Sequence, residues 1–374
     1  MLKPVENTPR QARLADMGVV RVQGADAVKF LQGQLSNDVS RVSADRSVLA
    51  GLHNPQGRAI ALLRLVLAGP DEILALVPRE LAAPVAARLG KFVLRAKVKT
   101  ADVSAEWDVV GVQLGGITGG FAAASVGAAR HDEEGRLWVC VATDDTAAAT
   151  PMSAEPPGAA DVPSGTDTRP VSRAGSAAAT TSRWLVASRA AAQPAEPDGA
   201  EAAASPDVGS PIPSMTRDEW RALDIASGIP QVYAATSESF VAQMLNLDFV
   251  DGIAFDKGCY TGQEVIARAH YRGKVKRRMQ RFRTREPAKL NASEAGTLND
   301  GRSFKIVDAV QLSDGRCEFL AVTTFGEGGD DAEASAAASG ATASSAAPSP
   351  AAASSENTAM LNAEPLPLPY SLPV

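Results

Sequence analysis

The sequence contains few cysteines, and they are widely separated. Its 374 residues include only 3 of them, Cys140, Cys259 and Cys317, and none belongs to a CxxC pair or a Cys/His cluster. An odd and scattered set argues against a disulfide framework, a zinc ribbon or an iron–sulfur cluster with local ligands. We therefore expect no permanent metal site, and a reducing compartment.

Long hydrophobic runs and a strong net charge are also absent. No stretch of about 18 apolar residues occurs in the sequence. The opening residues, Met-Leu-Lys-Pro-Val-Glu-Asn-Thr, lack the apolar core of a signal peptide. These absences predict a soluble, cytoplasmic protein without a membrane partner. Because the formal net charge is −6, binding of a nucleic acid would require a local basic patch.

Short strand patterns dominate the first part of the chain. Alternation and compact apolar runs predict strands at 19–22, 48–53, 58–67, 72–77, 97–103, 109–114 and 137–141. Helical spacing predicts helices at 25–35 and 79–92, and the apolar stripe of the second comprises Leu81, Val85, Leu89 and Phe92. Since no glycine-rich phosphate loop accompanies these strands, the pattern predicts α+β layers and not a Rossmann sheet.

Two stretches, 143–209 and 327–357, are rich in small and polar residues and have no hydrophobic periodicity. This composition predicts disorder. One island, 183–188, reads Arg-Trp-Leu-Val-Ala-Ser and predicts a buried strand of the fold. We therefore expect a body domain made of residues 1–142 and 183–273, with low-complexity segments at 143–182 and 189–209.

The last part of the chain predicts a separate small domain. Helical patterns at 216–227 and 263–270 precede it, and the strands expected within it are 276–284, 303–312 and 317–325. Strands without intervening helical periodicity indicate a small antiparallel β-barrel. This domain would span residues 274–374, with the disordered insertion 327–357 and a docked, extended end at 360–372.

Residues 257–264 read Lys-Gly-Cys-Tyr-Thr-Gly-Gln-Glu, an octapeptide with an unusual concentration of reactive groups. Cys259 precedes a predicted helix and lies two residues from Lys257, and the helix dipole and the ammonium both favour a thiolate. Such a thiolate could attack an electrophile, accept sulfur or transiently ligate a metal. The alternative is a small buried side chain in a tight loop, where Gly258 and Gly262 serve the backbone alone.

A basic stretch follows the octapeptide. Residues 257–283 include nine Lys or Arg and one acidic residue, a local net charge of +8. The expected anion patch comprises Arg268, Arg272, Lys274, Lys276 and Arg277. It could bind a polyanion such as tRNA or the polyglutamate tail of a folate. The alternative is a solvated strand face whose charges point outward.

The octapeptide, with the Val-Ile-Ala-Arg that follows it, resembles the signature of the YgfZ folate-binding family, which is related to the glycine-cleavage T protein (aminomethyltransferase). The resemblance extends over nearly all of the chain outside the low-complexity stretches. Further segments that resemble the family are Phe30–Val39, His53–Arg58, Leu223–Pro230, Gln243–Leu247 and Glu364–Leu372.

The resemblance implies a three-lobed, T-protein-like architecture with ferredoxin-like α+β layers, a central hole for tetrahydrofolate and a C-terminal β-barrel. It implies a folate-binding accessory protein that supports the assembly or maintenance of iron–sulfur enzymes, including those that modify tRNA. Its partners would be folate, iron–sulfur client or assembly proteins, and tRNA. The folate contacts that it suggests are Met17, Trp220, Gln243, Asn246, Tyr260, Gln263 and Glu264, with Cys259 and Lys257 at the reactive centre.

The sequence departs from the related aminomethyltransferases at their catalytic aspartate pair. The matching positions are about Ala61 and Leu62, which carry no carboxylate for proton transfer. Ala226 stands where relatives often have a glutamate, and Met17 replaces an aromatic partner of Trp220. These departures argue against glycine cleavage. A folate-dependent one-carbon transferase and a tRNA-binding module are the alternative functions.

Overall fold

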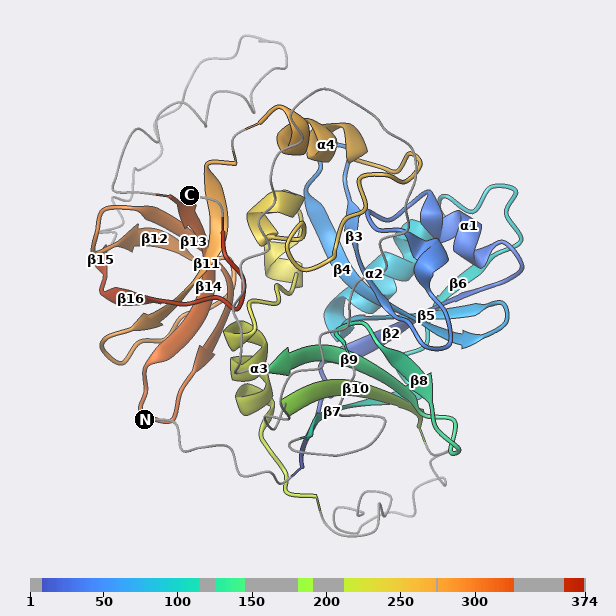
Figure 1. The fold of residues 1–374 in the computed structure, drawn as a ribbon, viewed down its shortest axis with the longest axis horizontal. Coiled ribbons are helices and arrows are strands. Elements are labelled where there is room, and N and C mark those ends of the chain that lie inside the picture. Colours follow the sequence, from blue (N-terminus) through green and yellow to red (C-terminus); the bar gives the residue numbers. More distant parts are fainter. Residues whose placement is uncertain are drawn as a thin grey trace, which may run out of the picture.

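A computed structural model of the chain describes residues 9–114, 125–144, 181–190, 212–273, 275–325 and 360–372. These residues form a mixed α+β structure that consists mostly of three β-sheets (Figure 1). Most of the two stretches that were predicted to be disordered lies outside the described residues. The prediction is wrong at 143–144, which end strand β9 (Leu137–Asp144), and at 181–182 and 189, which belong to strand β10 (Thr181–Arg189).

The first sheet has five antiparallel strands in the order β3-β4-β5-β2-β6. They are β2 (Met17–Gln23), β3 (Val48–His53), β4 (Ala59–Gly69), β5 (Glu72–Pro78) and β6 (Lys99–Asp102). Helices α1 (Ala27–Gln32) and α2 (Arg79–Gly90) share a core with Leu63 and Leu65 of β4. Because side chains alternate along a strand, Arg64 and Val66 point to the opposite face.

The second sheet also has five antiparallel strands, in the order β1-β7-β10-β9-β8. They are β1 (Arg10–Arg13), β7 (Trp107–Leu114), β8 (Ala129–His131), β9 (Leu137–Asp144) and β10 (Thr181–Arg189). The predicted strand island is confirmed, since β10 pairs with β7 on one side and β9 on the other. Val66 of the first sheet packs in one core with Val139 and Leu185 of the second.

The chain between the second and third sheets contains little regular structure. It forms α3 (Arg217–Ala226), short 3₁₀ turns at Ala234–Thr236 and Ala242–Leu245, and α4 (Gln263–Tyr271). A further 3₁₀ turn, Val39–Arg41, follows α1. Helix α3 begins at a capping box, in which the Thr216 side chain and Glu219 satisfy each other's backbone N–H groups. In Figure 1, α3 lies between the second and third sheets.

The third sheet has six strands in the order β15-β12-β13-β14-β11-β16. They are β11 (Arg277–Thr284), β12 (Ala295–Leu298), β13 (Ser303–Gln311), β14 (Cys317–Thr324), β15 (Met360–Leu361) and β16 (Ala363–Leu366). Its two edge strands are separated in sequence by Asn362 alone, so the sheet must be strongly curled. Met279, Val307 and Leu320 extend the first core into it.

Several details differ from the sequence prediction. The C-terminal domain is a curled sheet and not a wholly antiparallel barrel, because β15 runs parallel to β12 and no ladder joins the two edges among the described residues. The helix predicted at 25–35 is only Ala27–Gln32, because it ends at Gly33. Phe92 is 45 % exposed, because it follows the end of α2. The short strands β1, β8 and β12 were not predicted.

Candidate functional site

A narrow cavity lies where the three sheets and α3 meet. Its volume is about 90 Å³. The first sheet supplies Leu49 and Arg64, which pair across β3 and β4, and Leu76, which pairs with Arg64 from β5. The other lining residues are Leu14, Asp16, Met17, Leu62, Pro78, Val141, Leu185, Arg217, Trp220, Arg221, Asp224, Ile229, Pro230, Gln231, Tyr233 and Asp308.

Three ion pairs lie around the cavity. Asp16 accepts from Arg217 at 2.6 Å, and Asp224 accepts from the buried Arg183 at 2.5 Å. Both pairs leave a polar atom without a hydrogen-bond partner in the described structure, namely Asp16 Oδ1 and Arg183 Nε. Asp16 therefore presents an unused, buried acceptor at a cavity wall.

The third pair links the third sheet to α3. Arg221 Nε donates to Asp308 Oδ1 at 2.5 Å, and the Tyr233 hydroxyl donates to Asp308 Oδ2 at 3.0 Å. A register shift between Ile306 and Asp308 accompanies this inward carboxylate. Burial raises the pKa of Asp308, and burial with the nearby carboxylate raises the pKa of Tyr233. The three side chains thus close one wall of the cavity with a satisfied polar network.

Trp220 and Met17, two of the predicted folate contacts, both line the cavity. The Trp220 side chain is only 4 % exposed, however, because its ring packs against Gly111 of β7. A Cβ at Gly111 would come within 2.5 Å of the ring, and the Arg183 guanidinium lies 5.3 Å from its centroid. Protein atoms therefore cover most of the indole, which leaves little free ring surface for stacking.

The other five predicted folate contacts do not line this cavity. Gln243 donates to the Ile266 carbonyl at 2.6 Å, and Asn246 donates to the Met279 carbonyl at 2.8 Å. Both side chains are buried. Gln243 holds α4, and Asn246 holds the third sheet, to the 3₁₀ turn Ala242–Leu245. The remaining three belong to the octapeptide, namely Tyr260, Gln263 and Glu264. The resemblance had suggested a single site for all seven residues, of which only Met17 and Trp220 line this cavity.

Cys259 is exposed and does not line the cavity. The alternative of a buried structural cysteine is therefore wrong. The loop is held in place by Tyr260 and Ile266, which are buried in the core that the first sheet shares with α1 and α2. The ring centroids of Tyr260 and His53 lie 6.5 Å apart. Gly262 has φ +83° and caps α4, whereas a Cβ at Gly258 would meet nothing within 4 Å. Only Gly262 thus requires glycine.

Lys257 occupies a position that the sequence did not suggest. Its ammonium donates to the carbonyls of Gln32, Leu35 and Asn37 at 2.8, 2.7 and 2.8 Å, just beyond the end of α1. Burial lowers its pKa to about 8, and the carboxylate of Asp38 offsets part of this. A lysine so engaged stabilises the C-terminal end of a helix. Its three hydrogen bonds are used for anchoring the octapeptide to α1, and none joins it to the thiol.

We expect a thiol reagent to distinguish Cys259 from the other two cysteines. Cys140 and Cys317 are buried, and burial raises the pKa of Cys140 to about 11. Because thiolates react and buried thiols do not, the native protein should take up one equivalent of a chromogenic disulfide quickly. The denatured protein should take up all three equivalents. Rapid native labelling that persists in Cys259→Ala would contradict the assignment.

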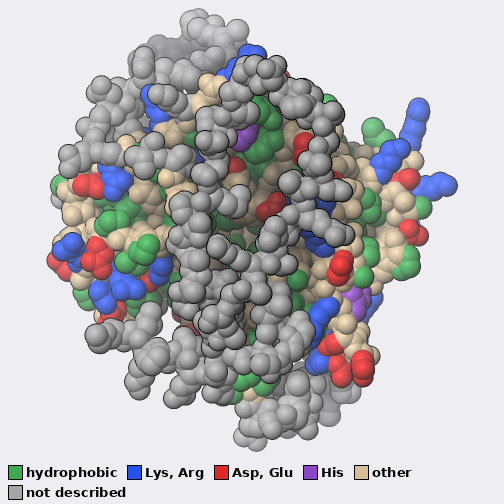
Figure 2. Space-filling model, viewed as in Figure 1, with side chains coloured by type: hydrophobic (Ala, Val, Ile, Leu, Met, Phe, Trp, Pro, Cys, Tyr) green, Lys and Arg blue, Asp and Glu red, His purple; other side chains and the backbone are tan. Residues whose placement is uncertain are grey.

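The predicted anion patch is only partly free. Arg268 pairs with Glu264 at 2.7 Å, and Arg277 donates to the Ser303 hydroxyl at 3.2 Å. Arg272 and Lys276 are exposed, and Lys274 lies outside the described residues. Figure 2 shows basic and acidic side chains intermixed over the third sheet.

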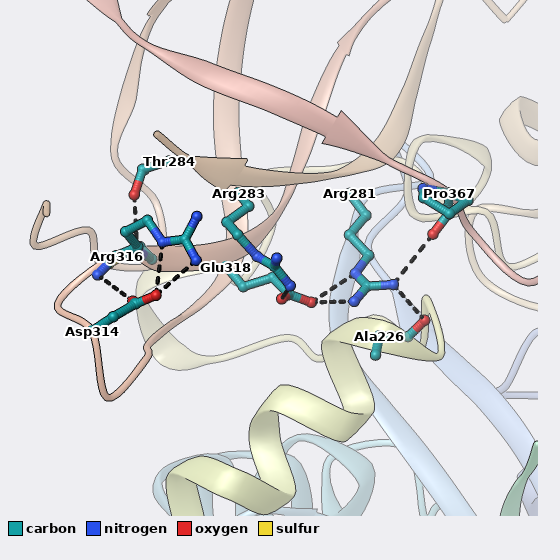
Figure 3. A network of polar contacts seen from close by, with 9 residues as sticks. Ala226, Arg281, Arg283, Thr284, Asp314, Arg316, Glu318 and Pro367 are labelled. Carbon is teal, nitrogen blue, oxygen red and sulfur yellow. Dashed lines mark hydrogen bonds and ion pairs between the residues drawn. The ribbon is translucent and has the colours of Figure 1, made fainter. Parts of the chain in front are cut away.

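Three further arginines of the basic stretch point inward. Arg278 forms a buried, bidentate pair with Asp248 at 2.9 and 2.8 Å. Arg281 and Arg283 flank the buried carboxylate of Glu318, at 2.7 and 2.9 Å, and Arg281 also donates to the Ala226 and Pro367 carbonyls (Figure 3). The surface therefore carries less positive charge here than the sequence count indicates.

Arg64 and Asp16 were missed by the sequence reasoning. Arg64 interrupts the apolar run of β4, Ala-Ile-Ala-Leu-Leu-Arg-Leu-Val-Leu, which is a detectable signal for a buried polar group. No cluster of acidic, histidine and cysteine side chains in the described part of the chain could hold a metal ion. Within the same residues, no helix is long and apolar enough to cross a membrane.

No family model matches the sequence. It is similar to the tRNA-modifying protein YgfZ of Edwardsiella ictaluri, with 30% identity over 324 residues, 83% of each chain. The protein of the same name from Escherichia coli O157:H7 is 30% identical over 313 residues, 81% of this chain and 82% of the relative. The fold resembles the glycine cleavage system aminomethyltransferase T from Bartonella henselae, with a TM-score of 0.55 at 10% identity, covering 85% of this chain and 79% of that one.

Proposed function

Because the chain belongs to the YgfZ family, we propose that it acts in tRNA modification, as a tetrahydrofolate-binding accessory protein for iron–sulfur enzymes. The relatives are named for tRNA modification, and the fold resembles that of a glycine cleavage system aminomethyltransferase T. One observation carries the proposal. The protein has both a cavity beside a polar atom without a partner, Asp16 Oδ1, and a separate, exposed thiol, Cys259.

Two features of the cavity support the binding of a tetrahydropterin. Met17, Leu62 and Pro78 provide an apolar wall, and Asp16 Oδ1 is a buried acceptor that lacks a donor in the described structure. The pterin ring carries N–H donors that could satisfy this oxygen if the Asp16 carboxylate turns toward the cavity. Tetrahydrofolate carries one-carbon units on its nitrogen atoms, and the protein would hold it away from bulk water.

The carboxylates at the cavity argue for binding over transfer chemistry. At the position of the missing aspartates, Leu62 lines the cavity and Ala61 belongs to the core. The acidic residues that do line it, Asp16, Asp224 and Asp308, each pair with an arginine. A carboxylate held by a guanidinium is a poor general base, because the ion pair favours its charged form. Burial raises the pKa of Asp308, but both of its oxygens already accept hydrogen bonds, from Arg221 and Tyr233. We therefore propose an accessory role and not an aminomethyl transfer.

Folate binding is tested by blocking the cavity. We expect tetrahydrofolate, titrated calorimetrically under anaerobic conditions, to bind the native protein. Met17→Trp should weaken binding about tenfold or more, because the larger ring fills the space beside Pro78. Val28→Trp on the exposed side of α1 is the matched control and should bind normally. Equal affinity of all three proteins would refute folate binding in this cavity. Trp220→Ala is a poorer probe, because the indole is part of the core.

The role of the thiol is tested in cells. A strain that lacks this protein should regain the activity of iron–sulfur enzymes that modify tRNA when the native gene is supplied. Cys259→Ser should fail to restore it, whereas Cys317→Ser, the same change at a buried thiol, should succeed. The readout is the fraction of modified nucleoside in tRNA, measured by mass spectrometry. Full restoration by Cys259→Ser would exclude a reactive role for this thiol.

A further inference from the structure

Arg64 is a buried charge without a counter-ion of its own. The side chain lies at the middle of β4, is 9 % exposed, and faces the cavity. No hydrogen bond or ion pair joins its guanidinium to another residue in the described parts of the chain. Burial lowers its pKa to about 10, so it remains charged at neutral pH. Buried arginines are ordinarily paired, because an isolated ion loses its hydration.

The neighbouring carboxylates are already used. Asp16 pairs with Arg217, Asp308 with Arg221, and Asp224 with Arg183. Asp224 is near enough to raise the pKa of Arg64, but the positive charge of Arg183 opposes it. Arg183 does not line the cavity, but it neutralises Asp224, so four guanidiniums in this cluster stand against three carboxylates. The cavity has one unmatched positive charge, and it is located on Arg64.

We propose that this cavity takes a ligand that carries a carboxylate, and that Arg64 is the residue that binds it. The proposal rests on the proposed function only in identifying the ligand, since the glutamyl part of a folate supplies such a group. The planar guanidinium fork matches a carboxylate with two parallel hydrogen bonds. A phosphate fits less well, because its charge approaches −2 and every other arginine at the cavity is already paired.

The proposal predicts a gain in stability when Arg64 is removed. Arg64→Met should raise the midpoint of thermal unfolding of the ligand-free protein by several degrees, because a similar volume replaces an uncompensated charge. The variant is thus expected to fold. Arg21→Met on β2 of the same sheet is the control, because Arg21 already pairs with Glu106 at the surface. It should leave the midpoint unchanged or lower it slightly. A marked loss of stability in Arg64→Met would overturn the proposal.

Binding measurements should distinguish recognition of the carboxylate from recognition of the pterin ring. We would titrate tetrahydrofolate, p-aminobenzoylglutamate and a tetrahydropterin without the glutamyl part, in a low-chloride buffer. Arg64→Met should bind the first two about tenfold more weakly or worse, and the third as the native protein does. Arg64→Lys, which keeps the charge but not the fork, should lie in between. An equal loss for all three ligands, or no loss for any, would overturn the assignment of Arg64 to a carboxylate.

The two proposals fail in different ways. If the native protein binds no folate but is stabilised by p-aminobenzoylglutamate or benzoate through Arg64, the folate function fails and the carboxylate site stands. If it binds tetrahydrofolate and the tetrahydropterin while Arg64→Met changes neither affinity nor stability, the carboxylate site fails and the folate function stands.

Discussion

Replacing Gly262 by alanine is expected to lower the free energy of unfolding by about 2–4 kcal/mol, because both the backbone and the surrounding space exclude a side chain. The residue has φ +83° at the start of α4. A Cβ would lie 2.5 Å from the Asn54 carbonyl oxygen and 3.1 Å from the Gly57 Cα. Both contacts are to backbone atoms of the β3–β4 turn, which cannot rotate away as a side chain could. The octapeptide would have to lift off this turn.

Gly258→Ala is the matched control within the same octapeptide. No heavy atom lies within 4 Å of a Cβ built on Gly258, and its φ is not left-handed. Its alanine variant should therefore stay within about 0.5 kcal/mol of the native protein. Urea unfolding followed by tryptophan fluorescence measures both variants. Similar losses in the two, or a stable Gly262→Ala, would show that the contact between the octapeptide and the hairpin turn is not required.

This pair of glycines illustrates what the sequence could and could not predict. Both lie at equivalent ends of Cys-Tyr-Thr, and both suggested tight turning. A left-handed φ and the approach of the hairpin turn 54–57, some 200 positions earlier in the chain, make one of them indispensable. Long-range contacts of this kind have no local signature. The same holds for Arg281 and Arg283 of β11, whose partner Glu318 lies on another strand.

Much of the fold was predictable because its elements have strong local patterns. The β3–β4 hairpin follows from its Asn-Pro-Gln-Gly turn, and β10 from an apolar run inside a polar segment. Both are confirmed by the ladders that they form. Strands of two to four residues, such as β8 and β15, have too few side chains to show a period. They are held in place by their neighbours and not by their own sequence.

The candidate site was predicted less completely than the fold. Met17 and Trp220, two of the suggested folate contacts, line one cavity, whereas no residue of the octapeptide lines it. Arg64 was overlooked because a charged residue in an apolar strand can point to either face of a sheet. Its direction depends on the register with Leu49 and Leu76, which only the paired strands define.

Replacing Lys257 by methionine should lower the free energy of unfolding by about 3 kcal/mol, because three carbonyl oxygens lose a charged donor at once. The ammonium joins the octapeptide to the segment that follows α1. Methionine has similar length but no donor, so Gln32, Leu35 and Asn37 would each retain an unsatisfied oxygen. Urea unfolding at pH 7, below the pKa of about 8, measures the loss while the native ammonium is charged.

The same variant decides whether Lys257 acts on the thiol. If the ammonium only anchors the loop, alkylation of Cys259 at pH 7 should proceed at the native rate in the folded fraction of Lys257→Met. Lys257→Arg separates the two effects, since it keeps the charge while its planar guanidinium cannot make the same three compact bonds. It should also be destabilised. If alkylation slows in Lys257→Met but not in Lys257→Arg, the positive charge at position 257 activates the thiol. Anchoring of the loop would then not be the whole role of Lys257. If both variants react like the native protein, then the exposure of Cys259, and not Lys257, makes it available.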